Sequence, residues 1–165
     1  HLHRSSDTTS VEMGAYLSRT ADELVSTHAQ PQPDVELKKE LEPIEVDAKT
    51  AFRLGLVFTE LLTNALKYAF APHKAGHIYI VFTRLDPHHV RLIVSDNGRG
   101  VEVEKLAAEH TKGTGPEAAG ASSSETGGFG LMLVRTLVEQ LEGDISVSSE
   151  HGTRVEVTVP SSSDG

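Results

Sequence analysis

Hydrophobic residues at helical spacing mark three stretches of the chain. In each, apolar side chains recur every three or four positions, which is the period of one face of an α-helix. The second stretch has the widest apolar stripe, so we expect that helix to pack against something large. Thr9, three residues before Glu12, is typical of a helix start, and Asp47 or Thr50 could cap the second helix. The predicted helices are residues 11–28, 48–70 and 129–141.

Alternating apolar and polar residues predict five strands between and after these helices. Prolines at positions 31 and 33 separate the first helix from the first strand, and Pro43 closes that strand. A turn at residues 86–89 joins the second and third strands into a hairpin, and Gly152 lies in the turn of the last hairpin. The predicted strands are residues 35–41, 77–82, 90–95, 145–149 and 153–159. This order of elements indicates an α+β sandwich, in which helices pack on one face of a mixed, mostly antiparallel sheet.

Composition narrows the class of protein. A chain of 165 residues with 38% hydrophobic and 24% charged residues fits one globular domain. It has no cysteine, which fits a reducing, cytoplasmic compartment and excludes thiolate metal sites. No apolar run reaches membrane-spanning length, so we expect no membrane contact by this domain. The net charge of −9 argues against nucleic-acid binding, which needs a basic surface.

One polar stripe interrupts the apolar second helix. Glu60, Asn64 and Lys67 stand at positions i, i+4 and i+7, so all three project from one helix face. A carboxylate, an amide oxygen and an ammonium group in line can orient a water, hold a hard cation such as Mg²⁺ and meet a phosphate. The alternative is an ordinary solvent-exposed stripe with a Glu–Lys pair.

Two glycine motifs follow further along the chain. Asp96-x-Gly98-x-Gly100 comes directly after a predicted strand, where an Asp can accept a hydrogen bond from an exocyclic amine, and where the alternative is an ordinary turn. The run 127–131, which includes Gly128, Gly130 and Leu131, opens the third predicted helix. Glycines there would leave free N–H groups facing a phosphate. No Gly-Lys-Ser/Thr follows, so this is not a Walker loop.

In their fixed order, the polar helix, the two glycine motifs and Gly152-Thr153 resemble the N, G1 and G2 boxes of the GHKL ATPase superfamily. That superfamily joins gyrase, the heat-shock chaperone, histidine kinases and the mismatch-repair ATPases. The resemblance covers about residues 35–160 and implies a Bergerat-type sandwich that binds ATP with Mg²⁺. Residues 141–149, followed by Gly152-Thr153 and a terminal Val-Pro, are similar to histidine kinases. Residues 5–24 and the helix sequence 60–70 together resemble the HWE-like class of these kinases and its sister group. The chain has no Trp, so the sister group fits better.

The resemblance also implies a role for each matching residue. Asn64 corresponds to the Mg²⁺ ligand and Glu60 to the acid that orients or activates the attacking group. Lys67 and Tyr68 fall where kinases contact phosphate and ribose, and Asp96 matches the residue that reads the adenine amino group. The remaining matches are Gly98 and Gly100 for the pocket floor, Gly128, Gly130 and Leu131 for the phosphate turn, and Thr153 for the hydroxyl that assists Asp96.

These matches predict the catalytic domain of a sensor histidine kinase. We expect residues 1–10 to be a trailing linker, 11–160 the catalytic domain with an ATP lid at about 102–127, and 161–165 a tail. The γ-phosphate would pass to a histidine on a separate dimerisation domain and then to a response regulator. His1 and His3 lack the sequence context of such an acceptor, and the other histidines form no metal-ligand pattern. The rivals are an anti-sigma-factor serine/threonine kinase and a protein-binding module that has lost ATP.

Overall fold

Five strands form the main sheet, in the order β2-β4-β5-β7-β6. The computed structural model describes residues 9–27, 35–68, 76–98, 125–149 and 151–162, with Tyr68 and residues 125–130 described by their backbone alone. β2 pairs with β4 in parallel, and every other pairing in this sheet is antiparallel. The sheet is therefore mixed and mostly antiparallel, as predicted. Its strands are β2 (Val35–Leu41), β4 (Gly76–Asp86), β5 (His89–Asp96), β6 (Asp144–Ser148) and β7 (Arg154–Pro160).

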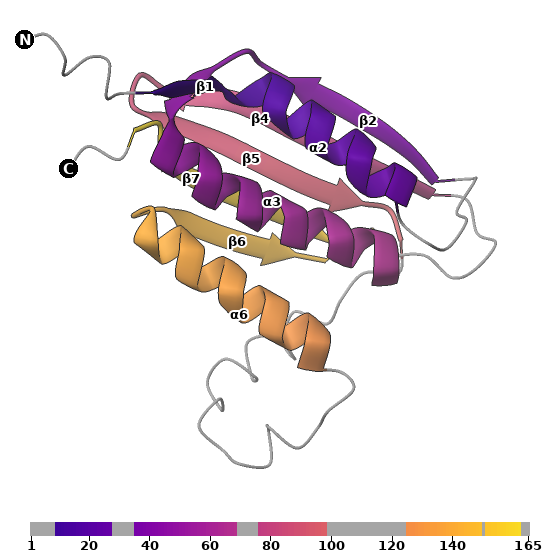
Figure 1. Cartoon of the computed structure of the whole chain (residues 1–165). Helices are drawn as coiled ribbons and strands as arrows, with labels where there is room; N and C mark the ends of the chain where they lie inside the picture. The colour runs from indigo at the N-terminus through magenta and orange to yellow at the C-terminus, as the bar shows by residue number, and fades with distance from the viewer. Residues whose placement is uncertain (1–8, 28–34, 69–75, 99–124, 150, 163–165) are drawn as a thin grey trace, which may run out of the picture.

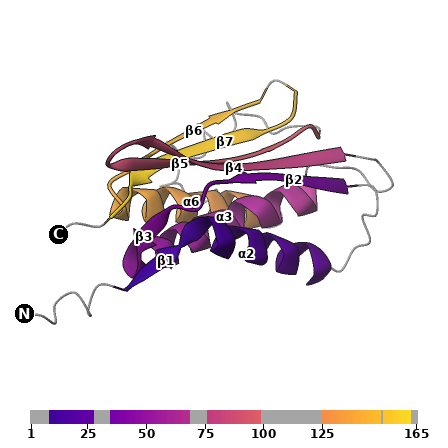
Figure 2. The same ribbon diagram turned by 90° about the horizontal axis from the view of Figure 1, so that it is seen from above.

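Within the described residues, three helices cover one face of this sheet (Figure 2). They are α2 (Met13–Thr27), α3 (Ala48–Tyr68) and α6 (Glu125–Gln140). In β4, β5 and β7 the residues that face the helices are buried, because successive side chains of a strand face opposite sides, whereas in the edge strands β2 and β6 alternate residues are half-buried. The core lies between the two layers, and its largest fully buried side chains include Phe58, Phe82, Leu54, Leu62 and Ile80. The predicted α+β sandwich is confirmed. None of the helices in the described part of the chain is long and apolar enough to cross a membrane.

The first predicted helix begins too early. Residues Ser10–Glu12 form a short strand, β1, which pairs antiparallel with β3 (Glu45–Asp47), and neither strand was predicted. The side chain of Glu12 accepts a hydrogen bond from the backbone N of Ala15 at 3.1 Å, so Glu12 and not Thr9 caps α2. The carbonyl of Thr9 instead accepts from the backbone N of Ala48 at 2.9 Å, which ties β1 to the start of α3.

The start of α3 is capped as predicted by one of the two candidates. The side chain of Asp47 accepts from the backbone N of Thr50 at 3.0 Å, which satisfies one of the free N–H groups of the first turn. The helix ends at Tyr68, and residues 69–70 of the predicted helix lie outside the described part of the chain.

The last helix begins four residues before the predicted start at 129. α6 starts at Glu125, so the glycines at 127, 128 and 130 lie inside its first two turns instead of preceding it. The N–H groups without an intrahelical partner belong to the first turn of a helix. They therefore fall at residues 125–127, ahead of Gly128 and Gly130.

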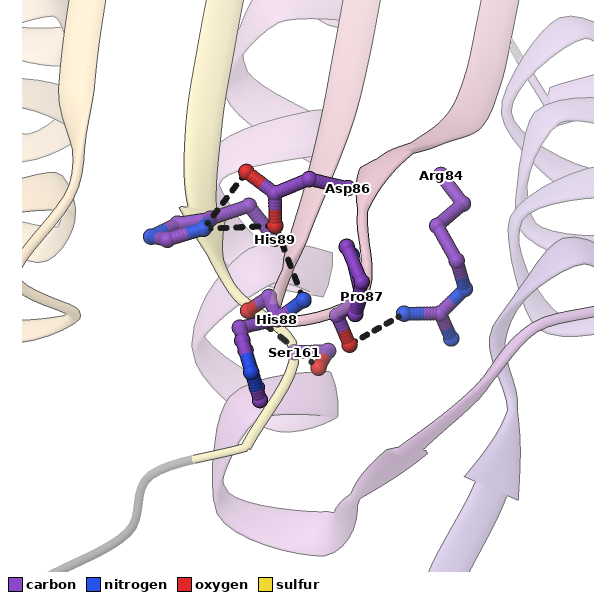
Figure 3. Close-up of polar contacts among 6 residues, drawn as sticks. All are labelled: Arg84, Asp86, Pro87, His88, His89 and Ser161. Carbon is purple, nitrogen blue, oxygen red and sulfur yellow. Dashed lines mark hydrogen bonds and ion pairs between the residues drawn. The ribbon is translucent and has the colours of Figure 1, made fainter.

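The turn between β4 and β5 forms a polar cluster at the opposite end of β5 from Asp96 (Figure 3). Both oxygens of Asp86 accept from Nδ1 of His89, at 2.9 and 3.1 Å, and Oδ1 also accepts from the backbone N of His88 at 2.8 Å. The carbonyl of His88 accepts from the backbone N of Ser161 at 2.8 Å. These bonds hold the predicted turn at 86–89 against the end of β7.

Candidate functional site

The segments that carry the predicted site residues, as far as the structure describes them, lie at one end of the sandwich. Figure 1 shows the end of β5, the last turns of α3 and the start of α6 on the same side of the molecule. Asp96 ends β5, and the backbone N of Asp96 donates to the carbonyl of Thr153, just before β7, at 2.9 Å. The topology therefore places the end of β5, the last turns of α3 and the start of α6 at the same end of the fold, although they are far apart in the sequence.

Asp96 has one carboxylate oxygen fixed by the backbone. Oδ1 accepts from the backbone N of Gly98 at 2.9 Å and from the backbone N of Thr153 at 3.3 Å. Oδ2 makes no hydrogen bond to any residue that the structure describes. Burial of the half-buried side chain raises the pKa of Asp96 above its ordinary value of 3.8, against the opposing effect of the two N–H donors.

Gly152 provides the space for this arrangement. Its φ is +119°, a conformation that other residues rarely adopt, and it is buried. A Cβ at this position would lie 1.9 Å from the backbone O of Asp96 and 2.8 Å from Cα of Asn97. Only glycine lets the last hairpin approach the end of β5 so closely.

The polar stripe of α3 faces away from the core. Glu60 and Asn64, one turn apart, are half-buried, and Lys67 is exposed in the last turn. Among the described residues, none of the three side chains makes a hydrogen bond or ion pair, so the Glu–Lys pair of the surface alternative is not formed.

These side chains could supply only part of the coordination shell of a magnesium ion. The described residues contain no group of three or more His, Asp or Glu that could hold a metal by itself. Mg²⁺ commonly takes one or two side-chain oxygens from the protein and fills its octahedral shell with waters and substrate phosphates. Asn64 with Glu60 beside it could supply such a partial set.

Some predicted site residues cannot be placed. Gly100 and most of the lid at 102–127 lie outside the described residues, and the side chain of Tyr68 is not described. Leu131, whose side chain is half-buried, lies on α6 with Gly128 and Gly130.

Asn97 is a site residue to which the sequence alone gave no role. Its backbone N donates to the carbonyl of His77 at 3.2 Å, and its side-chain Oδ1 accepts from the backbone N of His77 at 2.8 Å. The partner lies 20 positions earlier in the chain. No local pattern could have revealed it, although the β4–β5 hairpin pairing would place the two residues opposite each other.

Comparison with known proteins defines the class. The profile of the family "Histidine kinase-, DNA gyrase B-, and HSP90-like ATPase" matches residues 49–163, and the chain belongs to this family. This confirms the predicted GHKL membership and the likeness to catalytic domains of sensor histidine kinases.

The particular relatives are mostly histidine kinases. The chain is 28% identical over 151 residues to blue-light-activated histidine kinase 2 of Erythrobacter litoralis, a match that covers 91% of this chain and 38% of that protein. It is 27% identical to the serine-protein kinase RsbW of Oceanobacillus iheyensis, over 62% of this chain and 60% of that one. The solved histidine kinase domain of Erythrobacter litoralis EL346 superposes with a TM-score of 0.71 at 26% identity, over 92% of this chain and 62% of that one. The chain thus spans well under half of its full-length histidine kinase relative.

Proposed function

We propose that this chain is the ATP-binding catalytic domain of a cytoplasmic two-component sensor histidine kinase. It would transfer the γ-phosphate of ATP to a histidine on a separate dimerisation domain, from which a response regulator receives it. The observation that carries the proposal is Asp96, whose Oδ1 is held by two backbone N–H groups while Oδ2 has no partner among the described residues. A fixed, half-buried carboxylate with one free oxygen suits a single amine donor such as the adenine amino group.

The residues of α3 and α6 would act on the phosphates. Asn64 would share a Mg²⁺ ion with the phosphate oxygens, Lys67 would add positive charge, and Glu60 would orient the attacking group. Free N–H groups of the first turn of α6 would contact the phosphates together with the helix dipole. Mg²⁺, when bound, supplies charge neutralisation. Catalysis of this kind depends mostly on positioning and electrostatics.

We also propose boundaries for the domain, with residues 11–160 as the catalytic domain and residues 102–127 as the ATP lid. The serine-kinase alternative has less support, because the match to RsbW covers 62% of this chain against 91% for the histidine kinase.

A titration with fluorescent ATP, in Mg²⁺ and in EDTA, tests the metal ligand. We expect Mg²⁺ to tighten binding to the parent chain and Asn64→Ala to remove that difference, because the amide oxygen is its assigned ligand. Gln140→Ala, which removes an exposed amide from the far end of α6, is the matched control and should behave like the parent. An unchanged Mg²⁺ dependence in Asn64→Ala would remove that role.

The adenine contact is tested by the same titration with Asp96→Asn. We expect ATP affinity to fall about tenfold or more, since a hydrogen bond to a charged group contributes about 1.5–3 kcal/mol. Asp144→Asn, an exposed carboxylate at the start of β6, is the control. Equal ATP affinity in the two variants would contradict the proposal.

A further inference from the structure

At the end of β5, a side-chain hydrogen bond replaces one backbone hydrogen bond to β4. Ile78 pairs with Asp96 in the β4–β5 ladder, so the next residues outward, His77 and Asn97, face each other. In a regular antiparallel pair at such a position, the two residues exchange both backbone hydrogen bonds. Here Asn97 donates its backbone N–H to the carbonyl of His77 at 3.2 Å, but its side-chain Oδ1 takes the N–H of His77 at 2.8 Å.

The substitution of a side-chain oxygen for the backbone oxygen has a structural consequence. The backbone carbonyl of Asn97 is released from the ladder, so the chain can turn at once after Asp96. The turn brings the backbone N of Gly98 to 2.9 Å from Oδ1 of Asp96. With Thr153 on the other side at 3.3 Å, this donation fixes the rotation of the carboxylate.

We infer that Asn97 is a positioning residue that aims Oδ2 of Asp96 at its ligand. Without the side-chain acceptor, the N–H of His77 would be satisfied by the backbone carbonyl of residue 97, as in a regular strand. The strand would then be one residue longer, and the N–H of Gly98 would turn away from Asp96. Asp96 would keep its charge and the Thr153 contact, yet lose the donor that sets its orientation. Asn97 would thus control base selectivity without touching the nucleotide.

This inference rests on the proposed function, because it assumes that Asp96 reads the 6-amino group of adenine. Inosine triphosphate has the same sugar and phosphates as ATP but a carbonyl in place of that amino group and a hydrogen on the neighbouring N1. The ratio of the two dissociation constants therefore reports on recognition of this edge of the base and leaves out the phosphate contacts, which the two nucleotides share. A change in fold stability alone would not change this ratio for the folded protein.

The experiment measures this ratio by calorimetric titration of the parent chain, Asn97→Ala, Asn97→Asp and the control Gln140→Ala. Asn97→Ala should lower the preference for ATP about twofold to fivefold, the lower half of the range for one hydrogen bond, because Asn97 is exposed and water competes. Asn97→Asp keeps an oxygen for the N–H of His77 and should retain the parent ratio, as should Gln140→Ala. Thermal unfolding of each variant confirms that the titrated protein is folded.

The outcomes separate this inference from the proposed function. If the parent prefers ATP and Asn97→Ala prefers it equally, Asn97 does not position Asp96, while the proposed function stands. A loss of preference in Asn97→Asp would also overturn the inference, and this result decides the matter if Asn97→Ala fails to fold. If the parent chain binds neither nucleotide, the proposed function and the inference both fall.

Discussion

Gly152→Ala should damage both the fold and the site. The substitution forces a side chain into a φ of +119°, a strain of about 1–3 kcal/mol. It also places a Cβ 1.9 Å from the carbonyl O of Asp96, and real Cβ atoms essentially never approach within 3.0 Å of such an atom. The hairpin and the end of β5 must therefore separate by about 1 Å or more. The hydrogen bond from the backbone N of Thr153 to Oδ1 of Asp96, already 3.3 Å long, would then break.

Strain and the lost hydrogen bond together lower the free energy of unfolding by about 3–5 kcal/mol. Urea denaturation measures this loss, and nucleotide titration of the folded variant measures the site. Gly143→Ala is the matched control, because its Cβ would lie 2.3 Å from the carbonyl O of Thr158, away from Asp96. Both variants should lose stability, but only Gly152→Ala should lose ATP affinity in the folded state. A Gly152→Ala protein within about 1 kcal/mol of the parent, or equal ATP affinity in the two variants, would refute the reasoning.

Three further changes test the energetics of single residues. Asp96→Asn should raise the free energy of unfolding of the ligand-free chain at pH 7, because burial raises the pKa of Asp96 and disfavours its charged form. Urea titrations should show that this gain shrinks as pH falls toward 3.8. A gain that grows on acidification would contradict the reasoning. Asp86→Asn should lower the free energy of unfolding at pH 7, because the side-chain hydrogen bond with His89 lowers the pKa of Asp86. This loss of stability should disappear as pH falls below 3.8. An equal loss at both pH values would argue against the pairing. Glu142→Gly should raise the free energy of unfolding by about 1 kcal/mol, since Glu142 holds a φ of +59° just after α6. If thermal denaturation shows the variant to be less stable than the parent, this strain is absent.

Much of the fold was predictable because its periodic patterns are long. The apolar stripe of α3 and the alternation in β5 and β7 gave nearly the correct limits, whereas β4 continues to Asp86, four residues beyond the predicted end of that strand. The short elements were not predictable. β1 has three residues and depends on pairing with β3, more than 30 positions away, so Val11 fitted a helical face equally well. At α6, glycines suggested a loop, but the helix continues through them.

The candidate site could be proposed from its motifs, but its geometry could not be predicted. The order of Asp96, Asn64 and the glycine motifs along the chain made them candidates. The contacts around Oδ1 of Asp96 depend on distant residues: Thr153 is 57 positions away, and Gly152 matters because two backbones lie close together. Such contacts form only when the sheet has assembled, and no local spacing encodes them.

Nuclear magnetic resonance of the ¹⁵N-labelled chain during titration with Mg-ATP tests the central claim most directly. The account predicts saturable shifts of the backbone amides at Asp96, Gly98 and Thr153, together with the side-chain amide of Asn64. Residues 86–89, in the turn at the opposite end of β5, should stay unchanged. Saturable shifts confined to that turn, or no saturable shifts at all, would contradict the assignment of this end of the sandwich as an ATP site.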